Sequence, residues 1–459
     1  MASSVSRATI DRFARLKALQ PASSLHRSEH EAEPEANQVE QESLRRDSGT
    51  TIASERLELI LGAVVKRNCH GEHLSLHCWH AGPAPCIPDA VALKLLAPDA
   101  SEEIIDLRQW LFLDTETTGL MGGTGTYPFL VGLAWWEGGG LEVEQLFMRE
   151  YSEERSLLAA LAERLVERPV LVTFNGKSFD WPLLETRYRM THIIPPPAPR
   201  AHLDFLHPAR NLWRLRLGSA RLSQLERHVL GWDRGDDLVS QLIPSIYLNF
   251  VRHGHAHPLV PVFQHNQMDL CGLAGLSGRI LSLLGEESSS QDGLELYGIS
   301  GICERRGEIK RARKLYEQSI ASTLPAETDR AARTALARLA KRDGDLNLAR
   351  ELWGSMLGNS REGYKAYEQL AIHLEHEAKE PGQALGIVRD ALAQLRRANL
   401  VGMIAPAAYR KAKAQFEHRL GRLERKTGQT HLARKLRDPG FFRRPAFSGR
   451  IGKSKDRRR

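Results

Sequence analysis

The sequence predicts an α/β domain, in which helices flank a mixed sheet, followed by an all-α domain of helical repeats. Two observations carry this prediction. After Gln109, short apolar segments alternate with amphipathic ones, which is the pattern of buried strands and surface helices. After about residue 288, apolar residues recur at helical spacing and similar segments repeat along the chain.

We expect five segments in the chain of 459 residues. Residues 1–55 are expected to be mostly disordered, because much of this stretch is polar and rich in Glu, Ser and Gln. Residues 56–104 form a small β-rich lead-in, and residues 105–287 form the α/β domain. Residues 288–430 hold the helical repeats, and residues 431–459 form a flexible basic tail.

Composition narrows the class of protein. The net charge of +8 and the pI of about 9.3 favour contact with polyanions such as nucleic acid. Five cysteines, an odd number without the spacing of a small disulfide scaffold, indicate a reducing compartment, so a cytoplasmic location is expected. No apolar run approaches the roughly 18 residues of a membrane-spanning helix, and no membrane contact is expected.

Four strands are expected in the α/β domain, at QWLFLDTETT, PFLVGLAWW, LEVEQLFMR and VLVTFN. A helix over SEERSLLAALAERLVER separates the last two strands. Another helix must begin near Ser178, because Pro182 is tolerated only in a first turn. Further helical segments are expected around LDFLHPARNLWR, RLSQLERHVLG and HNQMDLCGLAGLSGRILSLL.

Two carboxylates, Asp114 and Glu116, end the apolar strand in LFLDTETTGL. Alternate residues of a strand point to the same face of a sheet, so these side chains are expected to lie side by side. Neighbouring negative charges are costly without a cation, and hard carboxylate oxygens suit Mg²⁺ or Mn²⁺. The alternative is a solvated turn rich in Asp, Glu and Thr.

Two later segments supply further polar candidates. In TFNGKSFDWPLLE a strand ends at Asn175, a tight turn follows, and Asp180 lies at the start of a helix. In HNQMDLCGL, His265 and Asp269 are four residues apart and share one face of a helix. Taken singly, Asp180 has an alternative as a helix-capping carboxylate, and His265 with Asp269 as a surface pair.

Together and in this order, the three segments resemble the DEDD exonucleases of the ribonuclease H-like superfamily, whose motifs are a strand-borne Asp-x-Glu, an Asn-x-x-x-x-Asp turn and a His or Tyr ahead of an Asp. The likeness is closer to the bacterial YprB-type ribonuclease H-like proteins, through DTETTGLMGGTGTYPFLVGLA, VLVTFNGKSFDWPLLETRY, LDFLHPARNLWR and HNQMDLCGLAGL. It covers residues 105 to 285, and the helical repeats are similar to that family too. One spacing departs: three residues separate His265 from Asp269, as in the tyrosine type, whereas the histidine type has four.

The resemblance implies a metal-dependent nuclease that hydrolyses phosphodiester bonds of DNA or RNA. It implies 3′–5′ exonuclease action, with a single-stranded end as the expected substrate. Two Mg²⁺ or Mn²⁺ ions would act in this site, one activating water and the other stabilising the leaving oxygen. The residues expected to hold them are Asp114, Glu116, Asp180 and Asp269.

The general base is expected to be His265, because its intrinsic pKa suits proton transfer near neutral pH. His255 and His257 lie nearby and remain alternatives. Three more residues are expected to contact the nucleic acid, namely Thr117, Asn175 and Lys177. For the last two, the alternative is a turn residue and a solvated lysine.

The helical domain shows an internal register. Aligning EIKRARKLYEQSI, DLNLARELWGSML and PGQALGIVRDAL places Ala312, Ala349 and Ala384 in register, at spacings of 37 and 35 residues. These spacings are near the 34-residue period of tetratricopeptide helix pairs, and the alternative is an ordinary helical bundle. The repeats are expected to bind a protein partner or to guide the substrate.

Two classes of function stay open from the sequence. The first is the nuclease; the second is a nucleic-acid or protein-binding scaffold in which the ribonuclease H-like domain is catalytically inactive. The presence of all four carboxylates favours the enzyme. The basic tail is expected to attract phosphates and to stack its phenylalanines on unpaired bases, with a solvated tail as the alternative.

Overall fold

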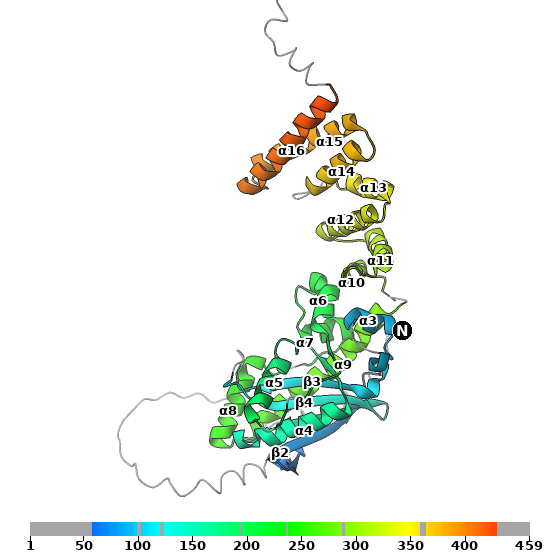
Figure 1. Ribbon diagram of the computed structural model, residues 1–459. Helices are drawn as coiled ribbons and strands as arrows, with labels where there is room; N and C mark the ends of the chain where they lie inside the picture. Colours follow the sequence, from blue (N-terminus) through cyan, green and yellow to red (C-terminus); the bar gives the residue numbers. More distant parts are fainter. Residues whose placement is uncertain are drawn as a thin grey trace, which may run out of the picture. The chain divides into compact units, whose positions relative to one another are not determined.

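The computed structural model describes residues 57–98, 102–119, 124–192, 194–195, 197–235, 237–286, 290–358 and 364–428. The chain divides into two compact units, one ending at Leu315 and the other beginning at Tyr316 (Figure 1). The expected disordered N-terminal segment and the basic tail lie outside the described residues.

A seven-stranded sheet forms the centre of the first unit, in the order β1-β2-β5-β4-β3-β6-β7. The five strands from β1 to β3 in this order pair antiparallel, whereas β3, β6 and β7 are parallel. The strands are β1 (Val64–Asn68), β2 (Gly71–His80), β3 (Trp110–Thr117), β4 (Pro128–Glu137), β5 (Gly140–Phe147), β6 (Val170–Thr173) and β7 (Ala201–Asp204). The predicted mixed sheet flanked by helices, followed by a many-helix region, is confirmed.

The β-rich lead-in is part of this sheet. Strands β1 and β2 form a hairpin, and β2 then pairs antiparallel with β5 from Leu74 opposite Phe147 to His80 opposite Leu141. Leu74 and Phe147 are fully buried. The lead-in therefore extends the central sheet and covers an edge that β5 would otherwise expose.

Helices α4 and α9 cover opposite faces of the sheet. On β5, Glu144 accepts a hydrogen bond from Arg164 of α4 at 2.6 Å, whereas the next residue, Gln145, bonds Asn266 of α9 at 2.8 Å. Successive side chains of a strand point to opposite faces, so the two helices lie on different sides. The face under α9 is the one that carries Asp114, because Gly132, opposite Asp114 on β4, pairs with Gln145.

Most predicted helices of the first unit are present. The helices are α3 (Ala90–Leu96), α4 (Glu154–Glu167), α5 (Asp180–Thr191), α6 (Leu206–Leu217), α7 (Leu222–Leu225), a π-helix (Glu226–Leu230), α8 (Ile243–His253), α9 (Val260–Leu284) and α10 (Gly293–Arg305). Short 3-10 helices span Glu102–Ile105, Leu107–Gln109, Tyr151–Glu153, Ser240–Leu242 and His257–Leu259. One expectation is wrong in part: the segment LDFLHPARNLWR does not begin as a helix, because its first residues complete β7.

The helices after α10 continue as an all-α array. They are α11 (Ile309–Ala321), α12 (Ala326–Arg342), α13 (Leu346–Ser355), α14 (Tyr364–His376), α15 (Pro381–Leu400) and α16 (Pro406–Lys426). The alanines aligned in the sequence, Ala312, Ala349 and Ala384, are all fully buried, as small residues at helix contacts should be. Identity with tetratricopeptide repeats stays a prediction. Within the described part of the chain, no helix combines the length and the apolar character needed to cross a membrane.

A buried carboxylate fixes the last helix. The side chain of Glu375, on α14, is 0% exposed and contacts three cations of α16: Arg419 at 3.1 Å, Arg422 at 2.6 Å and Lys426 at 2.9 Å. Burial alone would raise the pKa of Glu375, but hydrogen bonds from Arg422 and Lys426 lower that pKa to about 2. The carboxylate therefore stays ionised and ties α16 to α14.

Replacing Glu375 with glutamine is expected to destabilise the protein at pH 7 by about 1 to 3 kcal/mol, since the folded state then loses a carboxylate with a lowered pKa. The stabilisation is present above the unfolded pKa of about 4.5 and is lost as the pH falls toward 2. Urea unfolding followed by circular dichroism at pH 7 and near pH 2 measures this difference. The control is Glu417→Gln, which removes only an exposed pair with Lys413 at 3.6 Å; equal effects of the two substitutions would contradict the prediction.

Candidate metal centre and active site

Strand β3 places two carboxylates near its C-terminal end, where the strand leaves the buried core. Residues Trp110 to Leu113 are buried, whereas the residues from Asp114 onward are only partly buried. Asp114 and Glu116 alternate with Thr115 and so share one face of the sheet. The register with β4 shifts between Glu116 and Thr117, which ends regular pairing just past the carboxylates.

Asn266, on α9, holds Asp114 in place. Its side-chain NH₂ donates to Asp114 Oδ2 at 2.9 Å, and its Oδ1 accepts from Gln145 at 2.8 Å. Gln145 in turn accepts from Gln267 at 2.7 Å. This close approach requires Gly132, because a Cβ there would lie 2.1 Å from Asn266 Oδ1. An amide chain therefore fixes the orientation of the carboxylate.

Asp180 begins α5, after the predicted turn. Asn175 adopts a positive φ of 73°, and the carboxylate of Asp204 accepts the backbone N–H groups of Asn175 and Lys177 at 2.8 and 3.0 Å. Thr115 donates a hydrogen bond to Asp180 Oδ1 at 2.5 Å, which joins α5 to β3. Asp204 thus shapes the turn that leads from β6 to Asp180.

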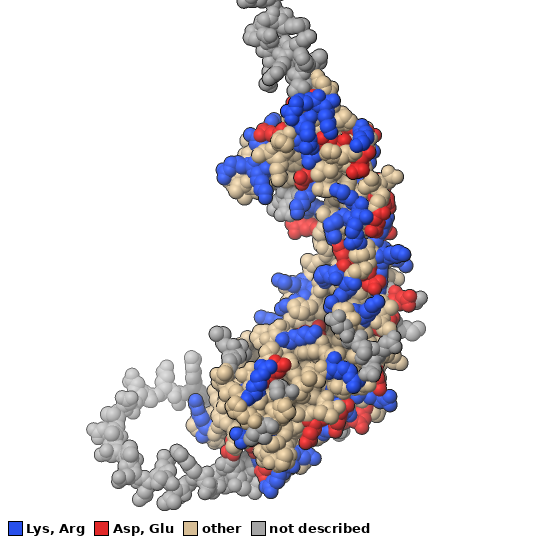
Figure 2. Space-filling model, in the orientation of Figure 1, with Lys and Arg blue, Asp and Glu red and all other residues tan. Residues whose placement is uncertain are grey.

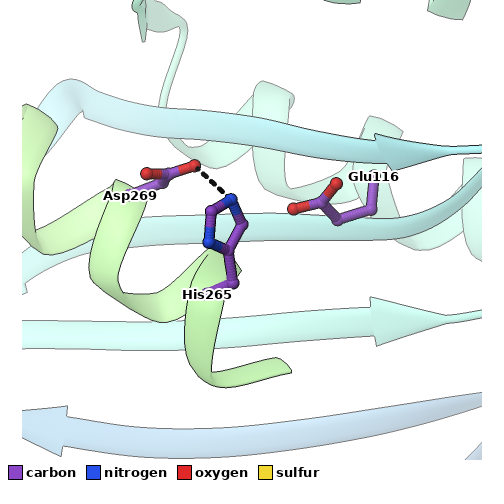
Figure 3. Close-up of side chains that lie close together, drawn as sticks. All are labelled: Glu116, His265 and Asp269. Carbon is purple, nitrogen blue, oxygen red and sulfur yellow. Dashed lines mark ion pairs between the residues drawn. The ribbon is translucent and has the colours of Figure 1, made fainter. Parts of the chain in front are cut away.

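His265 and Asp269 lie one above the other on α9 and face Glu116 of β3 (Figure 3). His265 Nε2 is 3.5 Å from Asp269 Oδ2. One possible ligand atom from each of Glu116, His265 and Asp269 lies within 4.8 Å of the others, so a single metal ion could contact all three. Two predicted carboxylates, Asp114 and Asp180, are not members of this close set.

The charges of Asp114 and Asp180 nevertheless act on the same site. Burial raises the pKa of Asp114 well above its usual range, and the charges of Asp269, Glu116 and Asp180 add to this. Burial, together with the charges of Asp269 and Asp180, raises the pKa of Glu116 to about 8, although His265 opposes the shift. Burial likewise raises the pKa of Asp180 to about 6. These carboxylates are therefore destabilised as anions without a cation.

The loop before the 3-10 helix at Ser240 adds two residues that the sequence reasoning missed. Arg234 donates to Asp269 Oδ1 and, at 3.0 Å, to Asp237 Oδ2. The other oxygen of Asp237 is 2.7 Å from His265 Nδ1. One loop therefore contacts both candidate side chains of α9, His265 and Asp269. The only signal in the sequence is the run of charges in DRGDD, which is common in solvated turns.

Glu226 also holds Arg234, because its two carboxylate oxygens accept hydrogen bonds from Nε and Nη2 along one edge of the guanidinium. Arg234 and Glu226 are buried, with side chains 7% and 2% exposed. Glu226 packs over α9 at Gly272, where a Cβ would lie 1.6 Å from Glu226 Oε1. Arg234 is thus fixed between a buried glutamate and Asp269.

The hydrogen bond from His265 to Asp237 sets the state of the imidazole. Burial lowers the pKa of His265, but Asp237, Asp269 and Glu116 outweigh burial and raise it to about 9. With Nδ1 engaged by Asp237, the ring presents Nε2 to the carboxylates. The two alternative histidines, His255 and His257, are exposed ahead of α9 and do not belong to the close set.

The donor set fits divalent cations. Among the described residues, the carboxylates at and beside this site outnumber its two cations, Arg234 and His265. Carboxylate oxygens are the ligands that Mg²⁺ and Mn²⁺ prefer. These carboxylates include Asp114, Glu116, Asp180, Glu226, Asp237 and Asp269.

Comparison with known proteins agrees with this architecture. Residues 111–280, from β3 into α9, match the family described as the RNase_H superfamily. The chain is 32% identical over 322 residues to YprB of Bacillus subtilis, an uncharacterized protein, and the match covers 69% of this chain and 74% of YprB. A family B DNA polymerase from the archaeon Pyrobaculum calidifontis is 14% identical with a TM-score of 0.30; the match covers 43% of this chain and 29% of the polymerase. The chain therefore belongs to the family of ribonuclease H-superfamily proteins that includes YprB.

Proposed function

We propose that the chain is a divalent-metal-dependent nuclease that hydrolyses phosphodiester bonds of DNA or RNA. The observation that carries this proposal is the excess of carboxylates around Glu116, His265 and Asp269, with the pKa values of Asp114 and Glu116 raised. Bound cations would reduce the repulsion between these carboxylates and so lower the free energy of the site. The match to the RNase_H superfamily is the reason for proposing nucleic acid as the substrate.

We propose further that the reaction is a 3′–5′ exonucleolytic one with two Mg²⁺ or Mn²⁺ ions held by Asp114, Glu116, Asp180 and Asp269. Bound there, the ions would supply charge stabilisation for the phosphodiester and a lower pKa for the attacking water. Asn266 orients Asp114, and Arg234 leaves the second oxygen of Asp269 directed at the site.

His265 is proposed as the group that accepts the proton of the attacking water, through Nε2. Without metal, burial lowers its pKa but Asp237, Asp269 and Glu116 raise it to about 9, so the ring is protonated. Cations bound to Asp269 and Glu116 would cancel their charges, lower this pKa and leave Nε2 able to accept the proton. The His265 side chain is only 8% exposed, and its hydrogen bond to Asp237 holds the ring in one orientation.

Thr117, Asn175 and Lys177 are proposed to contact the nucleic-acid backbone. The Thr117 hydroxyl donates to Gly119 O at 2.8 Å, and the Lys177 side chain is exposed beside the turn to Asp180.

The test incubates the purified chain with 5′-labelled single-stranded DNA and RNA, in Mg²⁺, Mn²⁺ or EDTA. We expect a ladder of products that shorten from the 3′ end in either metal and no products in EDTA. Circular single-stranded DNA serves as the control, because it offers no end. Cleavage of the circle would contradict the exonuclease assignment, and intact substrate in both metals would favour the scaffold.

A further inference from the structure

The charge of this chain is divided unevenly along its length. Residues 381–459 contain 21 Lys and Arg against 5 Asp and Glu, whereas residues 1–380 contain 43 against 51. The described part of this basic end is the helix pair α15 and α16 with its connection. Residues 381–428 carry 10 cations against 3 acids, and residues 316–380, the preceding helices, carry 9 against 11. The positive excess is therefore confined to one end of the helical array.

Half of the ten cations on this helix pair have acidic partners. Glu375 holds three of them, Glu424 lies 3.4 Å from Arg389, and Glu417 lies 3.6 Å from Lys413. The other five are exposed and have no acidic partner within the described residues. We call them the α15–α16 basic surface, and they are Arg396, Arg397, Arg410, Lys411 and Arg425.

Helix geometry groups these side chains. Arg396 and Arg397 lie near the end of α15, and Arg410 and Lys411 lie in the second turn of α16, after a connection of five residues. Helices α15 and α16 pack together as a hairpin, so these four cations lie at the same end of the pair. Arg425 is about 22 Å further along α16 at the rise of 1.5 Å per residue. Figure 2 shows Lys and Arg gathered toward both ends of α16.

The five cations raise the electrostatic energy of the folded helix pair and do not contribute to its packing. Neither α15 nor α16 has an acidic residue in its first turn, where the helix dipole favours one. Five like charges without partners repel one another. Packing of the pair is provided by the buried Leu392, Leu395 and Phe416, not by the exposed cations. A polyanion that binds across the surface would relieve the repulsion.

We propose that the α15–α16 basic surface binds the phosphate backbone of nucleic acid, outside the hydrolytic site and without reading sequence. The choice of nucleic acid among polyanions rests on the proposed function. Neutralising phosphates releases condensed counterions, so binding of this kind is strong at low salt and weakens as salt rises. The surface retains the substrate while the carboxylate site acts on its end.

The test compares the full chain with a variant in which all five residues are replaced by glutamine. Binding of fluorescein-labelled single-stranded DNA, single-stranded RNA and duplex DNA is measured by anisotropy in EDTA across a salt series. The matched control replaces five exposed cations that precede α15 by glutamine: Lys310, Lys314, Arg342, Lys365 and Lys379. Circular dichroism melting verifies that both variants fold like the parent.

We expect the Kd of the basic-surface variant to rise about tenfold or more at 0.1 M salt, and its salt slope to fall by up to about 3.5 for single strands. The control should stay within a factor of two of the parent. Equal Kd and slope for the two variants, on all three probes, would overturn the proposal. These measurements need no metal and no hydrolysis, so they test the basic surface separately from the nuclease. If the parent chain hydrolyses no nucleic acid but the basic-surface variant still binds more weakly than the parent, the nuclease proposal fails and the basic-surface proposal stands.

Discussion

Replacing Asp114 with asparagine is expected to lower nucleic-acid hydrolysis by about 10³-fold or more, since a carboxylate that would hold metal is lost. The fold should survive, because an asparagine oxygen can still accept the hydrogen bond from Asn266. Single-turnover assays in Mg²⁺ and Mn²⁺ measure the effect. The same loss is expected for Asp180→Asn, and full activity of Asp114→Asn would remove this residue from the site.

The same substitution, Asp114→Asn, is expected to leave the stability of the metal-free protein unchanged or to increase it. The pKa of Asp114 is raised in the folded state, so its ionised form at pH 7 costs folding free energy that the unfolded chain does not bear. Metal-free Asp114→Asn is therefore expected to have a Tm at or above that of the parent and to gain less Tm on addition of Mn²⁺. Asp106→Asn, which alters an exposed pair with Arg108, is the control and should leave activity and the Mn²⁺ response unchanged.

Replacing His265 with alanine is expected to lower the hydrolytic rate by about 10² to 10⁴, the usual contribution of a positioned acid or base. Mn²⁺ affinity, measured by electron paramagnetic resonance of the free ion, should be largely retained. A rate within a factor of two of the parent would move the role to another residue. A large loss of Mn²⁺ affinity would instead make His265 a ligand, alongside Glu116 and Asp269. His257→Ala is the matched control.

Asp237 offers a graded version of the same experiment. Asp237→Asn leaves the imidazole of His265 in the protein but removes the carboxylate that orients it and that pairs with Arg234. Partners of this kind commonly contribute 10- to 100-fold, so about that loss in rate is expected. Activity that is retained in Asp237→Glu but lost in Asp237→Asn would indicate that the negative charge of this carboxylate carries the effect.

Strands β3 to β6 and the shared face of Asp114 and Glu116 could be predicted because local rules determine them. The i, i+2 spacing of Asp114 and Glu116 has only one outcome on a buried strand, and Pro182 restricts where α5 can begin. These constraints act within a few residues and are visible in the sequence. The resemblance to a known family then placed the candidate residues in one site.

The rest of the site depends on contacts between distant segments. Arg234 is 35 residues from Asp269 in sequence, and Asn266 is 152 residues from Asp114. No periodicity encodes such pairs. The apolar residues of the segment before α6 are compatible with either a helix or a strand, and only pairing with β6 makes its first residues a strand. The lead-in hairpin joined the sheet for the same reason, since strand pairing is a tertiary event.

The amide chain beneath Asp114 limits the order in which this site can change during evolution. Gly132 cannot gain a side chain unless Asn266 first becomes smaller, because a Cβ and the Asn266 oxygen would occupy the same space. A smaller residue at 266, however, leaves Asp114 without the Asn266 donor and leaves Gln145 with Phe263 O alone as acceptor. Each single step therefore passes through a weakened intermediate. Strand β4, strand β5 and helix α9 are expected to exchange these residues only as a group, so the three positions should vary together among relatives.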